Sequence, residues 1–363
     1  MPSRPQRVVM LCPDLHEVGG IGAVSRMAFA ALQSQYGGGE VWNLGSPARN
    51  GSRFHSENWK VRYAYGRKAI PAMWSVQTGL RLSKHTLIVA MHLHLAPVAL
   101  PLVARGAELA VFLHGSEGWV PLSRVRTAAL RRSSVLIANT SFTIRKFKAV
   151  NPAFTDREIV ICPLGVPTLD CVSESPAHRK PFALIVSRIS STERHKGHDL
   201  LLQLWPQVIQ RFPPARLMVV GDGDDRVRLQ HKAAALGLGD TVEFLGRIDD
   251  RQLQQMYQDC ALYVMPSSRL EGFGLAFLEA MRAGKACIGG DGAANEVIVH
   301  AETGFIIEEG DSTALLNALT GLFVDSDRRT KMGRAGKKRF LNYFTESHFR
   351  QRFLEALDQR TEK

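Results

Sequence analysis

The chain has 363 residues, 45% of them hydrophobic, and a formal net charge of +12 at pH 7. This length suits two domains that each bury a core, and the hydrophobic content excludes a disordered protein. The five cysteines include no C-x-x-C pair, so neither a disulfide framework nor a zinc site is indicated, and a reducing cytoplasm is the simpler compartment. The first apolar run, Val8–Cys12, is too short for a signal peptide or a membrane-spanning helix, so we interpret it as a strand.

The positive charge is concentrated in the first half of the chain. Residues 1–170 hold 20 Lys/Arg against 9 Asp/Glu, whereas residues 171–363 hold 26 against 25. Basic residues of the acid-free stretches 58–107 and 118–155 interleave with aromatic ones, namely Trp59, Tyr63, Tyr65, Trp74, Trp119 and Phe142. This pattern favours contact with an anionic membrane surface, and the alternative is a soluble basic surface with aromatic residues in the core. No helix-turn-helix, zinc-finger or ribonucleoprotein signature supports nucleic acid as a partner.

Apolar strand-like runs alternate with helical patterns, as in α/β layers around parallel sheets. The first half is predicted to contain the strands Arg7–Cys12, Glu40–Leu44, Thr86–Leu95, Glu108–His114, Ser134–Asn139 and Glu158–Cys162. The second half is predicted to contain Phe182–Ser187, Ala215–Val220, Thr241–Leu245, Ala261–Pro266, Ala286–Gly289 and Gly304–Ile307. The stretch 166–181 lacks periodicity and holds three prolines, so it predicts a linker between domains 1–165 and 182–345.

Loops at the carboxyl ends of parallel strands are the expected ligand sites of such sheets. The loop after the first strand contains Gly19 and Gly20, which would let the backbone and a helix N-terminus approach an anion. An ordinary glycine turn is the alternative, because the loop lacks the full G-x-G-x-x-G pattern.

Histidines follow two further strands of the first half. His92 and His94 would share one face of a strand, and such pairs can bind metal, but no third ligand accompanies them at a suggestive spacing. His114 ends the next strand and is followed by Gly115. The alternative for His114 is a hydrogen-bonded core residue.

Basic residues cluster after the strand Phe182–Ser187. Arg188 and Lys196 lie before a helix, where an arginine fork and a lysine point charge can neutralise a diphosphate. A solvated charged loop is the alternative. The runs 219–224 and 242–247 end the next two strands, and Asp222 and Asp224 in the first of them have no evident metal-binding partners.

The stretch 261–282 carries the strongest signal. A buried strand leads into a Gly-Phe-Gly turn, then into the predicted helix Leu275–Arg282, with Glu271 in the turn and Glu279 about two turns along. A rise of ~1.5 Å per residue separates the two carboxylates by roughly 10 Å, comparable to the hexose-to-ribose span of a nucleotide sugar. Ordinary helix capping is the alternative.

This segment resembles the Glu-x7-Glu signature of retaining glycosyltransferases of the GT-B fold, specifically family 4, and the likeness covers most of the chain. The resemblance implies two Rossmann-like doubly wound domains facing a central cleft, with a helix in 346–363 crossing back to the first domain. It implies that Glu271, with the turn Phe273-Gly274-Leu275, contacts the donor sugar and that Glu279 holds the nucleotide ribose. It further assigns the donor diphosphate to Gly19-Gly20, Arg188 and Lys196, the active-site histidine to His114 and the base cradle to the region of Gly246.

Family members commonly place the arginine and lysine five positions apart, whereas here they are eight apart, so Arg194 is an alternative to one of them. The resemblance also implies a reaction without metal or cofactor, in which the leaving phosphate helps to deprotonate the acceptor.

The runs 193–199 and 221–225 look most like bacterial polysaccharide mannosyltransferases, which favours GDP-mannose as donor and a glycan or polyprenyl-diphosphate-linked acceptor at the cytoplasmic membrane face. A UDP-sugar enzyme with a soluble acceptor, a nucleotide-sugar epimerase, an α-glucan phosphorylase and a non-catalytic basic module remain alternatives.

Overall fold

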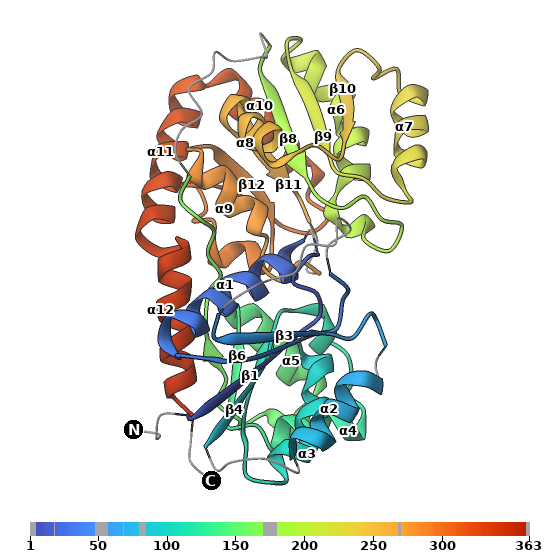
Figure 1. Ribbon diagram of the computed structural model, residues 1–363. Coiled ribbons are helices and arrows are strands. Elements are labelled where there is room, and N and C mark those ends of the chain that lie inside the picture. Colours follow the sequence, from blue (N-terminus) through green and yellow to red (C-terminus); the bar gives the residue numbers. More distant parts are fainter. Residues whose placement is uncertain are drawn as a thin grey trace. The chain divides into compact units, whose positions relative to one another are not determined.

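A computed structural model describes residues 5–17, 19–47, 57–67, 69–79, 85–169, 180–267 and 270–360 (Figure 1). The chain forms two compact units, one of Met1–Leu164 with Glu346–Lys363 and one of Gly165–Thr345. Most of the predicted linker, residues 170–179, lies outside the described part of the chain.

The first unit is built on a parallel seven-stranded sheet of order β3-β2-β1-β4-β5-β6-β7. Its strands are β1 (Arg7–Cys12), β2 (Gly39–Asn43), β3 (Trp59–Tyr63), β4 (Thr86–Ala90), β5 (Glu108–Leu113), β6 (Val135–Ala138) and β7 (Val160–Ile161). Its α-helices are α1 (Gly20–Gln35), α2 (Ala69–Gly79), α3 (Leu100–Val103), α4 (Arg124–Arg131), α5 (Ser141–Val150) and α12 (Glu346–Asp358), joined by the 3₁₀ helices η1 (Leu93–Ala99), η2 (Ser116–Gly118) and η3 (Pro152–Phe154).

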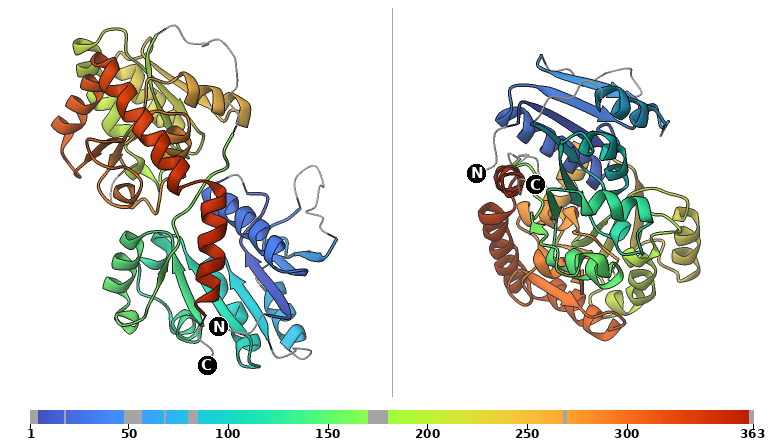
Figure 2. Two further views of the ribbon diagram at one scale, coloured as in Figure 1. Left: turned by 90° about the vertical axis from the view of Figure 1, so that its left-hand side faces the viewer. Right: turned by 90° about the horizontal axis from the view of Figure 1, so that it is seen from below.

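The C-terminal helix α12 is part of the first unit. It packs against α1 and approaches β6 (Figures 1 and 2). Arg360 beyond its end is buried and donates a hydrogen bond of 2.6 Å to Glu108 at the start of β5.

The second unit holds a parallel six-stranded sheet of order β10-β9-β8-β11-β12-β13. Its strands are β8 (Phe182–Val186), β9 (Arg216–Val220), β10 (Val242–Gly246), β11 (Leu262–Met265), β12 (Ala286–Gly290) and β13 (Gly304–Ile307). Its α-helices are α6 (His198–Arg211), α7 (Arg226–Ala235), α8 (Asp250–Asp259), α9 (Leu275–Arg282), α10 (Ser312–Val324) and α11 (Ser326–Tyr343), with the 3₁₀ helices η4 (Arg194–Lys196) and η5 (Ala293–Glu296).

The central strands are buried almost continuously, because helices cover both faces of a parallel sheet. In each unit the chain order reverses at one place, between β1 and β4 in the first and between β8 and β11 in the second. Loops beyond the carboxyl ends of strands at such a reversal are where open α/β sheets bind ligands.

The predicted strand Thr86–Leu95 is too long. β4 ends at Ala90, and Leu93–Ala99 forms the 3₁₀ helix η1, which contains Pro97 and is capped by the His92 side chain. The backbone N–H groups of His94 and Leu95 donate to His92 within this turn, so the run beyond Ala90 does not continue the sheet. His92 and His94 therefore do not share a strand face, and the prediction that they do is wrong.

The sequence analysis also missed the edge strand β3, which pairs in parallel with β2. Its aromatic ends, Trp59 and Tyr63, are buried in the first unit, as is Phe142 on α5. Trp59 packs edge-on against Phe29 of α1. These three rings belong to the core, because packing them against apolar neighbours removes large apolar areas from water, so their assignment to a lipid layer is wrong.

Candidate active site

The loops after β8 and β11 bring opposite charges together at the reversal point of the second sheet. Lys196 forms an ion pair with Glu271, and both side chains are only 15% exposed. Gly197, with φ of +91°, has no room for a Cβ atom, which would lie 2.7 Å from the Pro266 side chain after β11. The glycine therefore allows the lysine loop to approach the β11 loop closely.

The turn before α9 requires glycine at position 274. Gly274 has φ of +86°, and a Cβ atom there would lie 2.6 Å from the Phe277 ring. Helix α9 then runs from Leu275 to Arg282, as predicted from the sequence. Phe273 is 3% exposed and its ring packs edge-on against Phe344, with centroids 6.4 Å apart, so the ring is part of the core of the second unit.

Glu279 lies one turn into α9 and is half-buried. The Tyr257 hydroxyl on α8 donates a hydrogen bond of 2.7 Å to its Oε2. Burial raises the pKa of the Glu279 carboxyl, and the hydrogen bond from Tyr257 only partly opposes this. The Tyr257 bond therefore fixes one oxygen of a half-buried acid whose charged form is disfavoured by partial loss of water.

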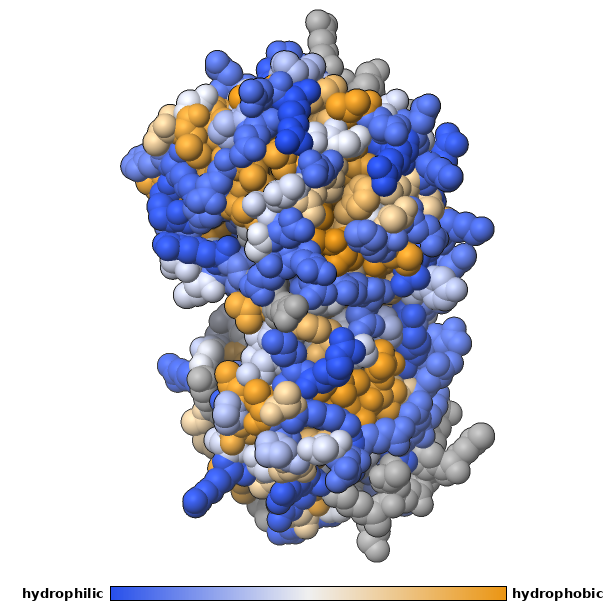
Figure 3. All heavy atoms as spheres, turned by 180° about the vertical axis from the view of Figure 1, so that it is seen from behind, coloured by the Kyte–Doolittle hydropathy of each residue, from blue (hydrophilic) through white to orange (hydrophobic). Residues whose placement is uncertain are grey.

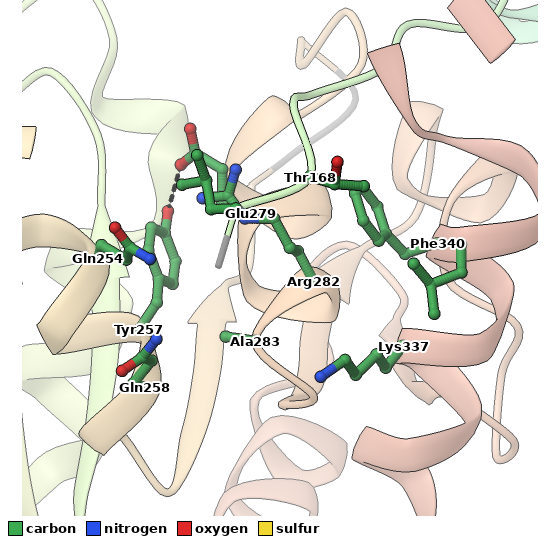
Figure 4. A pocket seen from close by; sticks show the side chains of 11 residues that line it. Thr168, Gln254, Tyr257, Gln258, Glu279, Arg282, Ala283, Lys337 and Phe340 are labelled. Atoms are coloured by element: carbon green, nitrogen blue, oxygen red, sulfur yellow. Dashed lines mark hydrogen bonds between the residues drawn. The ribbon is translucent and has the colours of Figure 1, made fainter. Parts of the chain in front are cut away.

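A pocket of about 240 Å³ adjoins Glu279 between α8, α9 and α11 (Figure 4). In Figure 4 the Tyr257 hydroxyl meets the Glu279 carboxylate and Lys337 extends from α11 toward α9. Arg282 donates a hydrogen bond of 2.8 Å to the Pro167 carbonyl. The lining residues are Thr168, Leu169, Gln254, Tyr257, Gln258, Glu279, Arg282, Ala283, Lys337, Phe340 and Leu341.

The two arginines of the loop after β8 have different partners. Arg188 donates two hydrogen bonds to Glu193, of 2.7 Å from Nε and 2.9 Å from Nη2. Arg194 donates two to Asp225, of 3.2 and 3.1 Å. Because Asp225 is 5% exposed and is tied into α7, Arg194 serves to anchor the loop, whereas Arg188 is 67% exposed.

An ion-pair network behind this loop joins α6 to α7. Arg228 donates to both Asp225 and Asp199, and Lys232 also binds Asp199 at 2.5 Å. Hydrogen bonds from Arg228 and then Lys232 hold the pKa of Asp199 well below its usual range.

The loop after β9 holds the Arg188–Lys196 loop in place through hydrogen bonds. Ser191 donates its backbone N–H to Asp224 at 3.1 Å, and Ile189 donates to the Asp222 carbonyl at 3.1 Å. Asp222 itself pairs with Arg226 at 3.6 Å, so its described partner is a cation and not a further metal ligand. Gly246, with φ of +68°, ends β10, and its carbonyl accepts from Gly221 at 2.9 Å.

In the first unit, His114 lies at the end of β5 and is buried. Its Nε2 donates to the Met91 carbonyl at 2.7 Å, and its backbone N–H donates to Glu117 Oε1 at 2.6 Å. Burial lowers the pKa of His114, which keeps the ring neutral near pH 7. In a neutral ring whose Nε2 carries the proton, Nδ1 is a hydrogen-bond acceptor.

The neighbouring His92 stacks on His114 with ring centroids 6.1 Å apart, and its Nδ1 accepts from the His94 backbone N–H at 3.2 Å. Burial lowers the pKa of His92 to about 4. Within the described residues, no group of three or more His, Cys, Asp or Glu side chains could hold a metal ion.

The Gly19-Gly20 pair lies where α1 begins, after the loop that follows β1. Gly19 precedes the helix and Gly20 is its first residue. The close approach falls at Gly22 instead, where a Cβ atom would lie 2.3 Å from the Glu17 carbonyl oxygen. The N-terminal amides of this long helix face an approaching anion.

Sequence reasoning did not single out Tyr257, Glu193 or Asp225 as site residues. Tyr257 lies at a core-facing position of α8, where an aromatic residue carries no signal of its hydrogen bond. Glu193 and Asp225 lie in charged runs, and only the folded loops reveal which cations they bind.

The chain matches known glycosyltransferases. Residues 172–339 match the family described as glycosyl transferases group 1. A GDP-mannose-dependent α-(1-6)-phosphatidylinositol monomannoside mannosyltransferase from Mycobacterium tuberculosis is 29% identical over 65% of this chain and 66% of its own length, just under two thirds. A phosphatidyl-myo-inositol mannosyltransferase from Mycobacterium leprae is 32% identical over 42% of this chain and 40% of its own.

Solved structures share the fold over nearly the whole chain. Sucrose-phosphate synthase from Thermosynechococcus elongatus has a TM-score of 0.80 at 20% identity and covers 98% of both chains. HepE from Anabaena, solved in complex with UDP, has a TM-score of 0.75 at 20% identity, covering 97% of this chain and 100% of its own.

Two parallel sheets with reversal points, matched by these solved structures over nearly the whole chain, define the GT-B fold. Residues 172–339 of the second unit match the group 1 glycosyltransferase domain, and this match, the mannosyltransferase relatives and the GT-B fold together support a glycosyltransferase of the family 4 type. In the part of the chain that the structure describes, no helix combines the length and apolar character needed to span a bilayer.

Proposed function

We propose that this protein transfers a hexose, mannose from GDP-mannose, to a membrane-associated glycan or lipid-linked acceptor in surface polysaccharide assembly. Transfer proceeds with retention of the anomeric configuration and without a metal ion. The GDP-mannose-dependent relatives support the choice of donor, and their phosphatidylinositol-based names support a lipid-bearing acceptor.

The ion pair between Lys196 and Glu271 carries the proposal. It joins the ends of β8 and β11 at the reversal point of the second sheet, where a nucleotide ligand is expected. A lysine here neutralises the charge that develops on the leaving diphosphate, and a neighbouring carboxylate accepts hydrogen bonds from sugar hydroxyls. The pair keeps both charged groups aligned before the donor arrives.

Glu279 supplies the ribose contact in this account. Tyr257 occupies its Oε2 at 2.7 Å, which leaves Oε1 to accept hydrogen bonds from ribose hydroxyls. Arg188 adds an exposed guanidinium fork that can bind two phosphate oxygens at once. Together with Lys196 and Glu271, these side chains contact the sugar, the diphosphate and the ribose of the donor.

His114 provides an acceptor on the first unit. Since its Nε2 proton is held by the Met91 carbonyl, Nδ1 can accept a hydrogen bond from a sugar hydroxyl without becoming charged. Stacking with His92 and the bond that Nε2 donates to the Met91 carbonyl fix the ring plane. The histidine therefore orients a hydroxyl and is not itself required to take its proton.

The first unit also supplies the membrane contact, on the cytoplasmic face, that a lipid-linked acceptor needs. Figure 3 shows apolar side chains gathered among charged ones on one face of each unit. In the first unit, Tyr65, Met73 and Val76 are exposed on and beside α2, and Val125 is exposed on α4 among arginines. Exposed apolar side chains with nearby basic residues favour an anionic lipid surface.

A thermal-shift panel of GDP, UDP and ADP tests the donor assignment, since only a ligand that prefers the native state raises its stability. We expect GDP to raise the melting temperature most. A shift with UDP alone would replace GDP-mannose by a UDP-sugar and leave the glycosyltransferase assignment standing, whereas no shift with any nucleotide would contradict the proposed donor site.

A further inference from the structure

Arg188 is more exposed than Arg194 and Lys196, which lie in the same loop after β8, and it already binds a carboxylate of the chain. Arg188 and Glu193 form a two-point pair, with Nε to Oε2 at 2.7 Å and Nη2 to Oε1 at 2.9 Å. The Arg188 side chain is 67% exposed and that of Glu193 is 22% exposed. Two parallel bonds to two oxygens are also the geometry with which arginine binds phosphate.

The loop that holds this pair is anchored at several points. Arg194, next to Glu193, is held by Asp225, and Ser191 is held by Asp224. The Glu193 backbone belongs to the same framework, because its N–H donates to the Ser190 carbonyl at 2.9 Å and its carbonyl accepts from Lys196 at 3.0 Å. The position of the Glu193 carboxylate near Arg188 is therefore set by the folded loop.

The charge of Glu193 is kept by its surroundings. Burial pushes the pKa of Glu193 upward, but the hydrogen bonds from Arg188 and the nearby charge of Lys196 outweigh it, so the pKa lies below its usual range. Glu193 is accordingly a carboxylate at neutral pH, in the form that competes with another anion.

We propose that Glu193 is an internal competitor of the donor diphosphate for Arg188, and that it sets nucleotide affinity and speeds product release. The inference rests on the proposed function of the same loop. A diphosphate that takes the Nε–Nη2 edge of Arg188 must displace Glu193 and then lies near its negative charge. The free nucleoside diphosphate released after transfer carries more charge than the donor, so Glu193 disfavours the product more than the substrate.

The test measures dissociation constants of GDP, UDP and inorganic pyrophosphate by calorimetry for the wild type and for Glu193→Gln. The glutamine keeps the size of the side chain and removes its charge. We expect the Glu193→Gln protein to bind these probes roughly three- to tenfold more tightly, which is the scale of an exposed ion pair plus a nearby like charge. The gain should be smaller at high salt, because salt screens these charges. Glu302→Gln, an exposed acid elsewhere in the same unit, is the matched control and should change nothing.

Arg188→Gln completes the cycle. The single variant should bind the nucleotides more weakly, and the double variant Arg188→Gln/Glu193→Gln should show no gain from the glutamate change. Equal or weaker binding by a Glu193→Gln protein that melts like the wild type would overturn the inference, as would a full gain in the Arg188→Gln background.

If Glu193→Gln melts early, Glu193→Ser provides the same sign test. If the wild type binds none of the three probes, the proposed donor site fails and this inference fails with it. If the wild type binds them and Glu193→Gln changes nothing, only this inference is contradicted.

Discussion

The Tyr257 hydroxyl on α8 donates a 2.7 Å hydrogen bond to the Glu279 carboxylate on α9, at the edge of a pocket of about 240 Å³. The bond holds one oxygen of a half-buried acid in place and links the two helices that border the proposed ribose site. It predicts that a change on α8 affects donor binding through Glu279.

Tyr257→Phe should raise the KM for the donor about fivefold or more and change kcat less than twofold, because the proposed ribose contact forms equally in the ground and transition states. Loss of the bond should also lower the free energy of unfolding by about 1 kcal/mol. Steady-state kinetics with varied donor check this. Tyr263→Phe, whose hydroxyl bonds to the Val186 carbonyl instead, is the control and should leave KM near the wild-type value. A selective fall in kcat would contradict the ribose role.

Lys196→Met and Glu271→Gln should each lower kcat about 100- to 1,000-fold, since both act on groups whose charge changes in the transition state. Single-turnover transfer at saturating donor measures this. Lys232→Met breaks another lysine–carboxylate pair in the same unit, with Asp199, and should retain activity. Turnover close to wild type in a folded Lys196→Met protein would remove these residues from the site.

His198 should make the protein less stable on mild acidification. Burial lowers the pKa of His198 from 6.5 to about 4, so between these values the unfolded chain binds the proton and the folded chain does not. Stability therefore rises with pH across this window and is lost as pH falls through it. Relative to His198→Gln, the wild type should lose about 2 kcal/mol between pH 7 and pH 5, measured by urea unfolding. Equal losses of unfolding free energy in both proteins would contradict the assignment of this pH dependence to His198.

The membrane proposal predicts that charge reversal in the first unit weakens binding to anionic vesicles at low salt, because each basic residue near the surface contributes about 1 kcal/mol. Vesicle sedimentation should fall at least roughly tenfold for a variant with four residues changed to Glu, namely Arg131, Arg132, Lys146 and Lys148. The matched control reverses four exposed basic residues of the second unit, namely Arg211, Lys331, Arg334 and Lys338. Equally poor wild-type binding to anionic and neutral vesicles would favour a soluble acceptor.

The strands β8 and β11 and the turn that holds Glu271 follow from local patterns. The apolar runs at β8 and β11 and the Gly-Phe-Gly turn specify a strand–turn–helix unit, and the observed α9 has the predicted bounds, Leu275–Arg282. Such features depend on neighbours along the chain, which the sequence displays directly.

Other features depend on distant partners. The strand Trp59–Tyr63 carries Lys60 and Arg62 at an exposed sheet edge, so its composition resembles a basic surface segment until it pairs with β2. The Arg194–Asp225 pair spans 31 positions, and no local rule chooses Asp225 over the adjacent Asp224. These contacts decide which arginine of the lysine loop reaches a ligand.

Transfer from a labelled nucleotide sugar to a lipid extract tests the central claim most directly. With GDP-mannose, the account predicts an acceptor-dependent, α-linked product, formed equally well in excess EDTA and absent with Lys196→Met. The account would be contradicted if the folded wild type released free sugar or an epimer, or bound the nucleotide without turnover. A β-linked product or loss of activity on chelation would also contradict it.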